Sequence, residues 1–134
     1  MPGQPKESAD IEYVVGPALV GAVAEQVEAI YLASFPAAER EPFATIAQGV
    51  QAGSRWLCCA RVSGRVVGFA IISPLWRAQV ALLDFLATEA AMRGQGVGRK
   101  IVETVAHHLR GEPASLAMII EAESDVIGSP EERR

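Results

Sequence analysis

The strongest constraint on the fold is the segment from residue 80 to residue 110, where an apolar run leads through a glycine-rich turn into an amphipathic stretch. Residues 80–88 read VALLDFLAT, which is typical of a strand buried on both faces. The turn that follows holds glycines at alternate positions, 94, 96 and 98. Apolar residues then recur at every fourth position, which predicts one buried face of a helix that ends at about residue 110. These residues are Val97, Ile101, Val105 and Leu109.

A glycine-rich turn at the start of a helix is also a chemical signal, because it can form a cradle for a pyrophosphate group. Glycines adopt positive φ angles at little cost, which lets several backbone N–H groups converge on one point. The start of the helix adds N–H groups without partners and a partial positive charge. Arg93, Arg99 and Lys100 add cations. The alternative is an ordinary connection from strand to helix, which does not need three glycines beside three cations.

Two common phosphate-binding motifs do not fit this turn. The dinucleotide motif G-x-G-x-x-G fails because Arg99 stands where its third glycine belongs. The P-loop motif fails because no G-x-x-x-x-G-K-[ST] register exists around Lys100. The pattern that fits is R-x-x-G-x-G, formed by Arg93, Gly96 and Gly98.

Shorter elements precede and follow this segment. Apolar residues at positions 19, 23, 27, 30 and 31 share one face of a helix. Pro36 ends that helix, because the residue before a proline disfavours helical geometry. A second helix is expected from residue 43 to about residue 49. The remaining expected strands occupy residues 11–15, 56–62, 66–73 and 115–122.

The connections between these strands predict the topology. Ser63-Gly64 is typical of a hairpin turn, so the strands on either side of it are antiparallel. Pro74 is expected to end the second of them. The strand–helix–strand unit from residue 80 to residue 122 predicts a parallel pair. The expected fold is therefore α/β, of the α+β kind: a mixed, mostly antiparallel sheet with a parallel fourth and fifth strand and with helices on both faces.

Residues 82–109, LLDFLATEAAMRGQGVGRKIVETVAHHL, resemble the acyl-CoA-binding motif of the GNAT superfamily of N-acyltransferases, which has a [Q/R]-x-x-G-x-[G/A] turn after its fourth strand. SFPAAERE, residues 34–41, resembles a loop between the first two helices of some members, and VSGRVVGFAII resembles the second and third strands. The resemblance covers about residues 11–123, with a disordered leader (1–10) and a polar tail (124–134) outside it. It implies transfer of an acetyl group from acetyl-CoA, the co-substrate, to an amine acceptor, without a metal ion.

The resemblance also assigns residues to the site. Backbone groups of Leu86 and Thr88 would bond the pantetheine arm, and the N–H of Leu86 would polarise the thioester oxygen. Arg93 would lie beside the pyrophosphate. The N–H groups that would meet the pyrophosphate belong to Gly94, Gln95, Gly96, Val97, Gly98 and Arg99.

Asp84 is the candidate for removing a proton from the amine acceptor, directly or through a water molecule. It interrupts an apolar strand, where burial makes a carboxylate a better proton acceptor. The alternative is a structural role, as a buried carboxylate bound by backbone donors. The sequence leaves both interpretations open.

Other charged residues also have two interpretations. The loop at 39–41 either shapes the acceptor site, as in the resembled family, or is solvated. Two glutamates on one side of the fifth strand either line the acceptor or face solvent. His107 and His108, near the end of a helix, are interpreted as surface residues. The acidic and basic candidates of the loop and the strand are Glu39, Arg40, Glu41, Glu121 and Glu123.

Charge and cysteine usage exclude some classes of protein. The net charge of −4 and a pI of about 5.2 argue against nucleic-acid and anionic-membrane partners. No apolar run reaches the roughly 20 residues needed to cross a bilayer, and the polar start is not a signal peptide. Cys58 and Cys59 are neighbours and cannot bridge without strain, so both are expected to be reduced in a cytoplasmic protein; a reactive redox pair is the alternative.

The sequence departs from the resembled family at its end. Family members continue past the fifth strand with a helix and two strands, a region that usually supplies a tyrosine to protonate the leaving thiolate. The only tyrosines here, Tyr13 and Tyr31, come far too early. The chain is therefore expected to lack that part of the fold. Three hypotheses for its function remain: an enzyme, a CoA-binding module with little catalysis, or half of a split domain. The exposed edge of strand 115–122 is expected either to pair in a homodimer or to make the chain poorly soluble.

Overall fold

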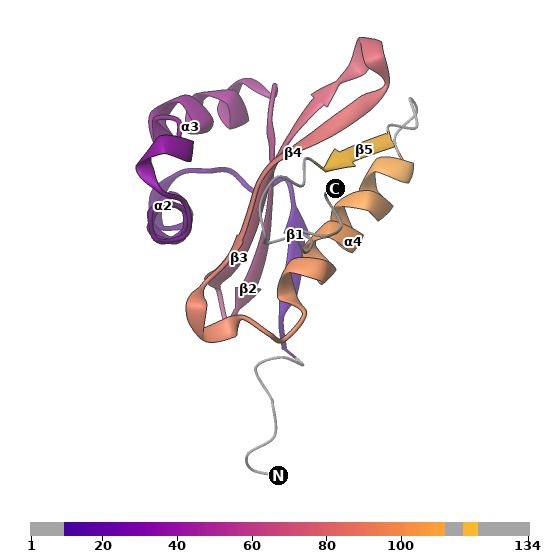
Figure 1. Ribbon diagram of the computed structural model, residues 1–134. Coiled ribbons are helices and arrows are strands. Elements are labelled where there is room, and N and C mark those ends of the chain that lie inside the picture. Colours follow the sequence, from indigo (N-terminus) through magenta and orange to yellow (C-terminus); the bar gives the residue numbers. More distant parts are fainter. Residues whose placement is uncertain (1–9, 112–116, 121–134) are drawn as a thin grey trace, which may run out of the picture.

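The computed structural model describes residues 10–111 and 117–120, so the expected leader (1–10), apart from its last residue, and the expected tail (124–134) lie outside the described residues (Figure 1). The described strands form one sheet whose order follows the chain. They are β1 (Glu12–Val15), β2 (Trp56–Val62), β3 (Arg65–Leu75), β4 (Val80–Thr88) and β5 (Ala117–Ile120).

The first four strands pair antiparallel with their neighbours in sequence, which confirms the mostly antiparallel sheet. β5 lies beside β4 in parallel, from Val80↔Ala117 to Leu83↔Ile120. The predicted hairpin turn is present, and Ser63 and Gly64 have φ angles of 51° and 82°. Two consecutive positive φ angles are typical of the type I′ turn, whose twist matches that of paired strands.

In the described part of the chain, three α-helices cover the two faces of the sheet, as expected. Figure 1 shows α2 (Gly21–Ser34) and α3 (Phe43–Ala52) on one face and α4 (Val97–Arg110) on the other. None of the helices that the structure describes is long and apolar enough to cross a membrane.

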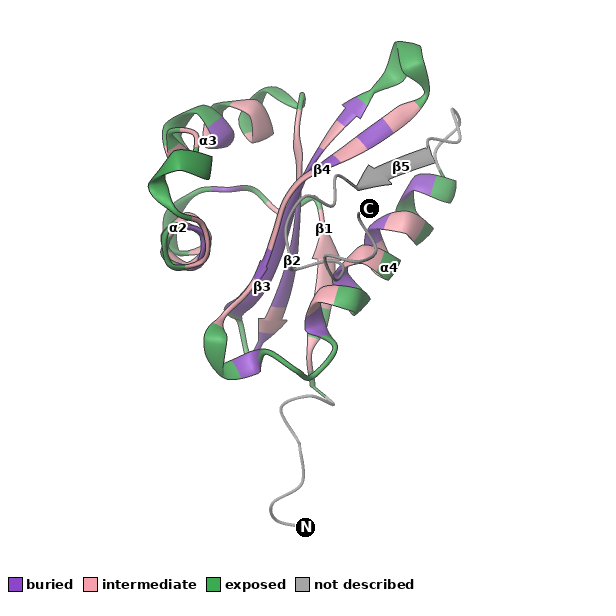
Figure 2. Cartoon of the chain, in the orientation of Figure 1, coloured by how far each residue is buried: buried purple, intermediate pink, exposed green. Residues whose placement is uncertain are grey.

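Each face of the sheet has its own core, and Figure 2 shows the buried residues along the middle strands and on the inner side of α4. The predicted apolar face of α4 is confirmed, since all four of its residues are at most 2% exposed. Opposite them, the second core contains Tyr31 of α2 and Ile46 of α3, packed on β2 and β3.

Two predicted boundaries are wrong. β3 continues through Pro74 to Leu75, because the described pairing of β2 stops at Trp56↔Ile72. Beyond that point the side of β3 that faces away from β4 has no strand in the described part of the chain, so the missing N–H of a proline breaks no ladder there. α3 ends three residues later than expected, at Ala52, because Gly53 with φ of 84° provides the left-handed C-cap.

Candidate active site

The connection between β4 and α4 is anchored to β3. The N–H of Glu89 donates to Val67 O at 2.8 Å, and the Glu89 carboxylate pairs with Arg65 at 2.7 Å. A single 3₁₀ turn, η3 (Ala90–Met92), follows, and Met92 is buried under it. The glycine-rich turn therefore leaves the sheet from a fixed point.

Two of the three glycines in the turn have the expected backbone. Gly94 and Gly96 have φ angles of 82° and 81°, and a Cβ added to either would meet no described atom within 4 Å. Gly98 lies inside α4 without a positive φ, and a Cβ there would touch Thr88 Oγ1 at 3.8 Å, an ordinary contact. The backbone therefore favours glycine at 94 and 96, whereas the geometry at 98 also accommodates alanine.

The start of α4 presents backbone donors beside these glycines. Gly96 is the N-cap, and the N–H of Lys100 donates to Gly96 O at 3.0 Å. The N–H groups of Val97, Gly98 and Arg99 precede the first intrahelical bond, so they have no partner within the helix. No side chain caps this end of α4. An anion placed here would meet N–H groups and the positive end of the helix dipole.

The predicted cations lie around this turn, and one of them already has a contact. Arg93, Arg99 and Lys100 are all exposed. The Nε of Arg93 donates to Thr88 O at 3.1 Å, which folds this side chain back over the end of β4. Gln95 Nε2 donates to Ala91 O at 3.5 Å.

Near its end, one side of the β4 backbone pairs with no strand among the described residues. Because the N–H of Glu89 donates to Val67 of β3, alternation along the strand directs the backbone groups of Leu86 and Thr88 away from β3. The contact of Thr88 O with Arg93 agrees with this orientation. The described pairing with β5 stops at Leu83. Within the described ranges, Leu86 and Thr88 thus lie on an edge without a neighbouring strand.

Asp84 lies at a β-bulge in β4. Phe85 pairs with Ile71 and Leu83 pairs with Ile72, so Asp84 has no partner across the ladder. A bulge of this kind directs two consecutive side chains to the same face. Asp84 and Phe85 accordingly both face α2 and α3, where Phe85 packs against Tyr31 with ring centroids 5.1 Å apart.

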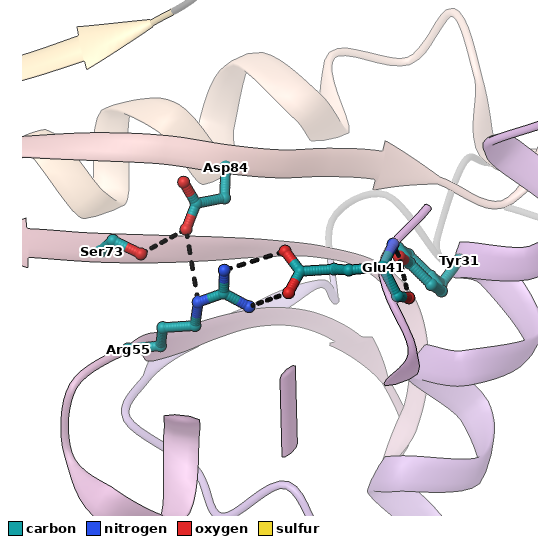
Figure 3. A network of polar contacts seen from close by, with 5 residues as sticks. All are labelled: Tyr31, Glu41, Arg55, Ser73 and Asp84. Carbon is teal, nitrogen blue, oxygen red and sulfur yellow. Dashed lines mark hydrogen bonds and ion pairs between the residues drawn. The ribbon is translucent and has the colours of Figure 1, made fainter. Parts of the chain in front are cut away.

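The Asp84 carboxylate is bound by side chains rather than by the backbone donors that the structural interpretation expected. Its Oδ2 accepts a hydrogen bond from Ser73 Oγ and lies 3.6 Å from Arg55 Nε (Figure 3). The side chain stays 19% exposed. Asp84 is thus a half-buried carboxylate with one oxygen held and with a route to solvent.

Glu41 joins this cluster from the loop between α2 and α3. Its carboxylate accepts two hydrogen bonds from Arg55, from Nη1 at 3.2 Å and from Nη2 at 2.9 Å. Its backbone N–H donates to the Tyr31 hydroxyl at 2.7 Å, and that hydroxyl donates to Glu41 O at 2.8 Å. Tyr31 is 1% exposed, and burial raises the pKa of its hydroxyl. Glu41 is therefore fixed in place.

The sequence did not indicate Arg55 or Ser73 as site residues. Arg55 directly precedes the expected strand 56–62 and Ser73 ends the expected strand 66–73, and at such positions an arginine or a serine is usually solvated. Their partners are distant in sequence, with Glu41 14 positions from Arg55 and Asp84 11 positions from Ser73. The only indication in the sequence was Arg55 itself, a charged residue directly before the apolar strand 56–62.

The other candidates lie away from this cluster. Arg40 Nε donates to Phe35 O at 2.7 Å, where it caps the end of α2, and Glu39 is exposed. His107 is exposed, and His108 contacts the Trp56 ring edge-on at 5.3 Å. Glu121 and Glu123 lie outside the described residues. In the described ranges, no three His, Cys, Asp or Glu side chains are grouped so that they could hold a metal ion.

The two cysteines are buried and free, one in each core. Burial raises the pKa of Cys58 to about 12 and that of Cys59 to about 11. A thiol reacts as its thiolate, so both are poorly disposed to redox chemistry in the folded chain. The structural interpretation is therefore favoured over a redox pair.

Solved structures of N-acetyltransferases share this fold. The ribosomal-protein-alanine N-acetyltransferase from Brucella melitensis biovar Abortus 2308 matches with a TM-score of 0.63 and 18% identity, over 91% of this chain and 84% of that one. An aminoglycoside acetyltransferase from an uncultured soil metagenomic sample, in complex with sisomicin, matches with a TM-score of 0.67 and 13% identity, over 88% and 80%. An aminoglycoside 6'-N-acetyltransferase complexed with coenzyme A gives 0.64 and 15%, over 72% and 54%.

The fold is thus that of the N-acetyltransferases. Residues 24–128 match the sequence model of the acetyltransferase (GNAT) family, and the chain belongs to that family. A comparison with curated proteins gave no match. The resemblance inferred from the β4–turn–α4 segment is confirmed.

Proposed function

We propose that this chain transfers an acetyl group from acetyl-CoA to an amine acceptor. The proposal rests on two features that follow each other along the chain, the open backbone edge at Leu86 and Thr88 and the donor-rich turn at Gly94 and Gly96. The turn suits a pyrophosphate, and the strand edge suits an extended chain with amide groups. Membership of the family and the coenzyme A complex of a protein with the same fold support the assignment.

The residues present fit acetyl-CoA. The N–H groups from Gly94 to Arg99 would bind the pyrophosphate, and Arg93 would add charge beside it. The backbone groups of Leu86 and Thr88 would pair with the pantetheine arm as with an added strand. Bound acetyl-CoA supplies an activated acyl group, and the N–H of Leu86 would donate to its carbonyl oxygen.

Asp84 would accept the proton that the amine must lose before it attacks. Its Oδ2 is held by Ser73 and Arg55, and its Oδ1 makes no hydrogen bond with any described residue. A carboxylate that is held on one oxygen and free on the other is suited to take a proton, directly or through one water molecule. The amine nitrogen would bond to the acetyl carbon as the C–S bond of the thioester breaks, and the CoA thiolate would leave and take its proton from solvent. The proposal includes no metal ion.

The test measures release of free CoA thiol from acetyl-CoA against a panel of amines. Asp84→Asn is expected to lower kcat by about 100-fold or more, the usual contribution of a general base, while the Kd for acetyl-CoA stays near that of the wild type. Glu103→Gln makes the same chemical change on the exposed side of α4 and is the matched control. A loss of acetyl-CoA affinity as large as the loss of turnover in Asp84→Asn would assign Asp84 a structural role instead.

The acceptor is proposed only as an amine: a small amine, a peptide N-terminus and a lysine side chain are all compatible with the cluster. Binding of acetyl-CoA without thiol release would favour the alternative, a CoA-binding module or half of a split domain. A cytoplasmic location and a homodimer through the edge of β5 stay predictions.

A further inference from the structure

We infer that Arg55, held in place by Glu41, is the positioning residue for the Asp84 carboxylate. The inference rests on the proposed function, because it concerns how the proposed proton acceptor is oriented. It assigns a role to two residues outside β4 and the glycine-rich turn.

The first step is the geometry of the Arg55 guanidinium, which uses all three of its nitrogen atoms in the cluster. Nη1 and Nη2 bind the two oxygens of Glu41 at 3.2 and 2.9 Å, and Nε lies 3.6 Å from Asp84 Oδ2 (Figure 3). A two-point contact fixes the plane of the guanidinium as well as its position. Glu41 therefore determines where Arg55 Nε meets Asp84.

The second step is the anchor of Glu41 itself. Both backbone hydrogen bonds of Glu41 go to the hydroxyl of Tyr31, whose ring packs edge-on against Phe85. Phe85 follows Asp84 in the bulge of β4. The loop that carries Glu41 and the bulge that carries Asp84 are thus both positioned by contacts with the buried side chain of Tyr31. This arrangement distinguishes Glu41 from a solvated loop carboxylate.

The third step is the consequence for Asp84. Ser73 and Arg55 both contact Oδ2, so the carboxylate is held from one side, and Figure 3 shows Oδ1 directed away from Arg55. Among the described residues, the charged side chains of the cluster are the two carboxylates of Asp84 and Glu41 and the single guanidinium of Arg55. A net negative cluster attracts a protonated amine, whereas a lost Arg55 would leave two carboxylates without their cation.

The experiment is a double-mutant cycle in the acetyl-transfer assay. Arg55→Gln is expected to lower kcat by about 10- to 100-fold, the usual cost of a misplaced group, with KM for acetyl-CoA unchanged because the CoA-binding turn is untouched. Arg55→Lys keeps the charge but loses the two-point contact, and an intermediate kcat is expected.

In the Asp84→Asn background, Arg55→Gln is expected to cause no further loss of kcat. Arg61→Gln breaks the ion pair with Glu12 on β1 and is the matched control.

The outcomes separate the two proposals. Wild-type turnover in Asp84→Asn would overturn the proposed role of Asp84. Slower turnover in Asp84→Asn, together with an equal effect of Arg55→Gln in both backgrounds, would overturn only the positioning role. If Arg55→Gln does not fold, Glu41→Gln decides, because it releases Arg55 without removing a cation. Its kcat should fall with KM unchanged, and an unchanged kcat would overturn the inference.

Discussion

Gly96 is the residue on which the turn depends most directly. Its φ of 81° lies in the left-handed region, it caps α4, and a Cβ there would point into space free of described atoms. Another residue at this position therefore meets two separate obstacles. It adopts an unfavourable backbone angle, and its side chain adds bulk within the turn that is proposed to bind the pyrophosphate.

Gly96→Val is expected to abolish binding of acetyl-CoA while the chain still folds. The backbone cost is about 1–2 kcal/mol, and the added side chain blocks the approach of the phosphates. Titration calorimetry with acetyl-CoA measures the loss. Gly53→Val is the matched control, because Gly53 has φ of 84°, also faces free space and lies at the end of α3, away from the turn. Full affinity in folded Gly96→Val would show that the turn is only structural.

At the scale of elements, the close packing of α4 on β3 depends on Gly68. A Cβ added there would lie 3.1 Å from Ile101 Cδ1 and 3.2 Å from both Val97 Cγ1 and Ala87 O. These distances are too short for two side chains and a backbone oxygen to accommodate without movement. The helix that carries the donor N–H groups therefore lies on the sheet at a distance that this glycine permits.

Gly68→Ala is expected to lower the free energy of unfolding by about 1–3 kcal/mol, the usual cost of overpacking. Urea unfolding followed by circular dichroism measures it. Gly98→Ala adds the same methyl group at a helical position with room for it, so it is expected to be neutral or to stabilise by about 0.5–1 kcal/mol. A Gly68→Ala chain as stable as the wild type would show that α4 shifts without cost.

For the whole molecule, the two buried thiols link stability to pH. The pKa of Cys58 rises from 9.0 to about 12 and that of Cys59 from 9.0 to about 11, in each case first because burial disfavours the thiolate. A pKa raised by folding gives stability that is fully present below the unfolded pKa. That stability is lost as the pH rises from 9 toward the folded values.

The free energy of unfolding is therefore expected to fall above pH 9, with a slope of up to about 1.4 kcal/mol per pH unit for each thiol. Burial also raises the pKa of Tyr13 and Tyr31 above 10.0, so the slope steepens beyond pH 10. Urea unfolding in reducing buffer from pH 7 to pH 11 measures the change, and Cys58→Ala should reduce the slope. Constant stability over this range would contradict the assigned burial.

The sequence by itself determined the helices, the antiparallel strands and the motif of the turn. These features depend on local patterns: alternate glycines, apolar residues at every fourth position, and a Ser-Gly turn between two apolar runs. Its errors were at boundaries that depend on neighbours. The effect of Pro74 depended on where β2 stops pairing, and the end of α3 was set by the backbone of Gly53.

Only the tertiary structure decided how Asp84 is held. The bulge in β4 results from the register between two strands, which no local pattern encodes, and it directs Asp84 and Phe85 to the same face. The contacts of Asp84 with Ser73 and Arg55, and of Arg55 with Glu41, join segments that are remote in sequence. The sequence indicated a carboxylate in an apolar strand, but its surroundings depend on which segments the fold packs together, because distance in space is set by the whole chain.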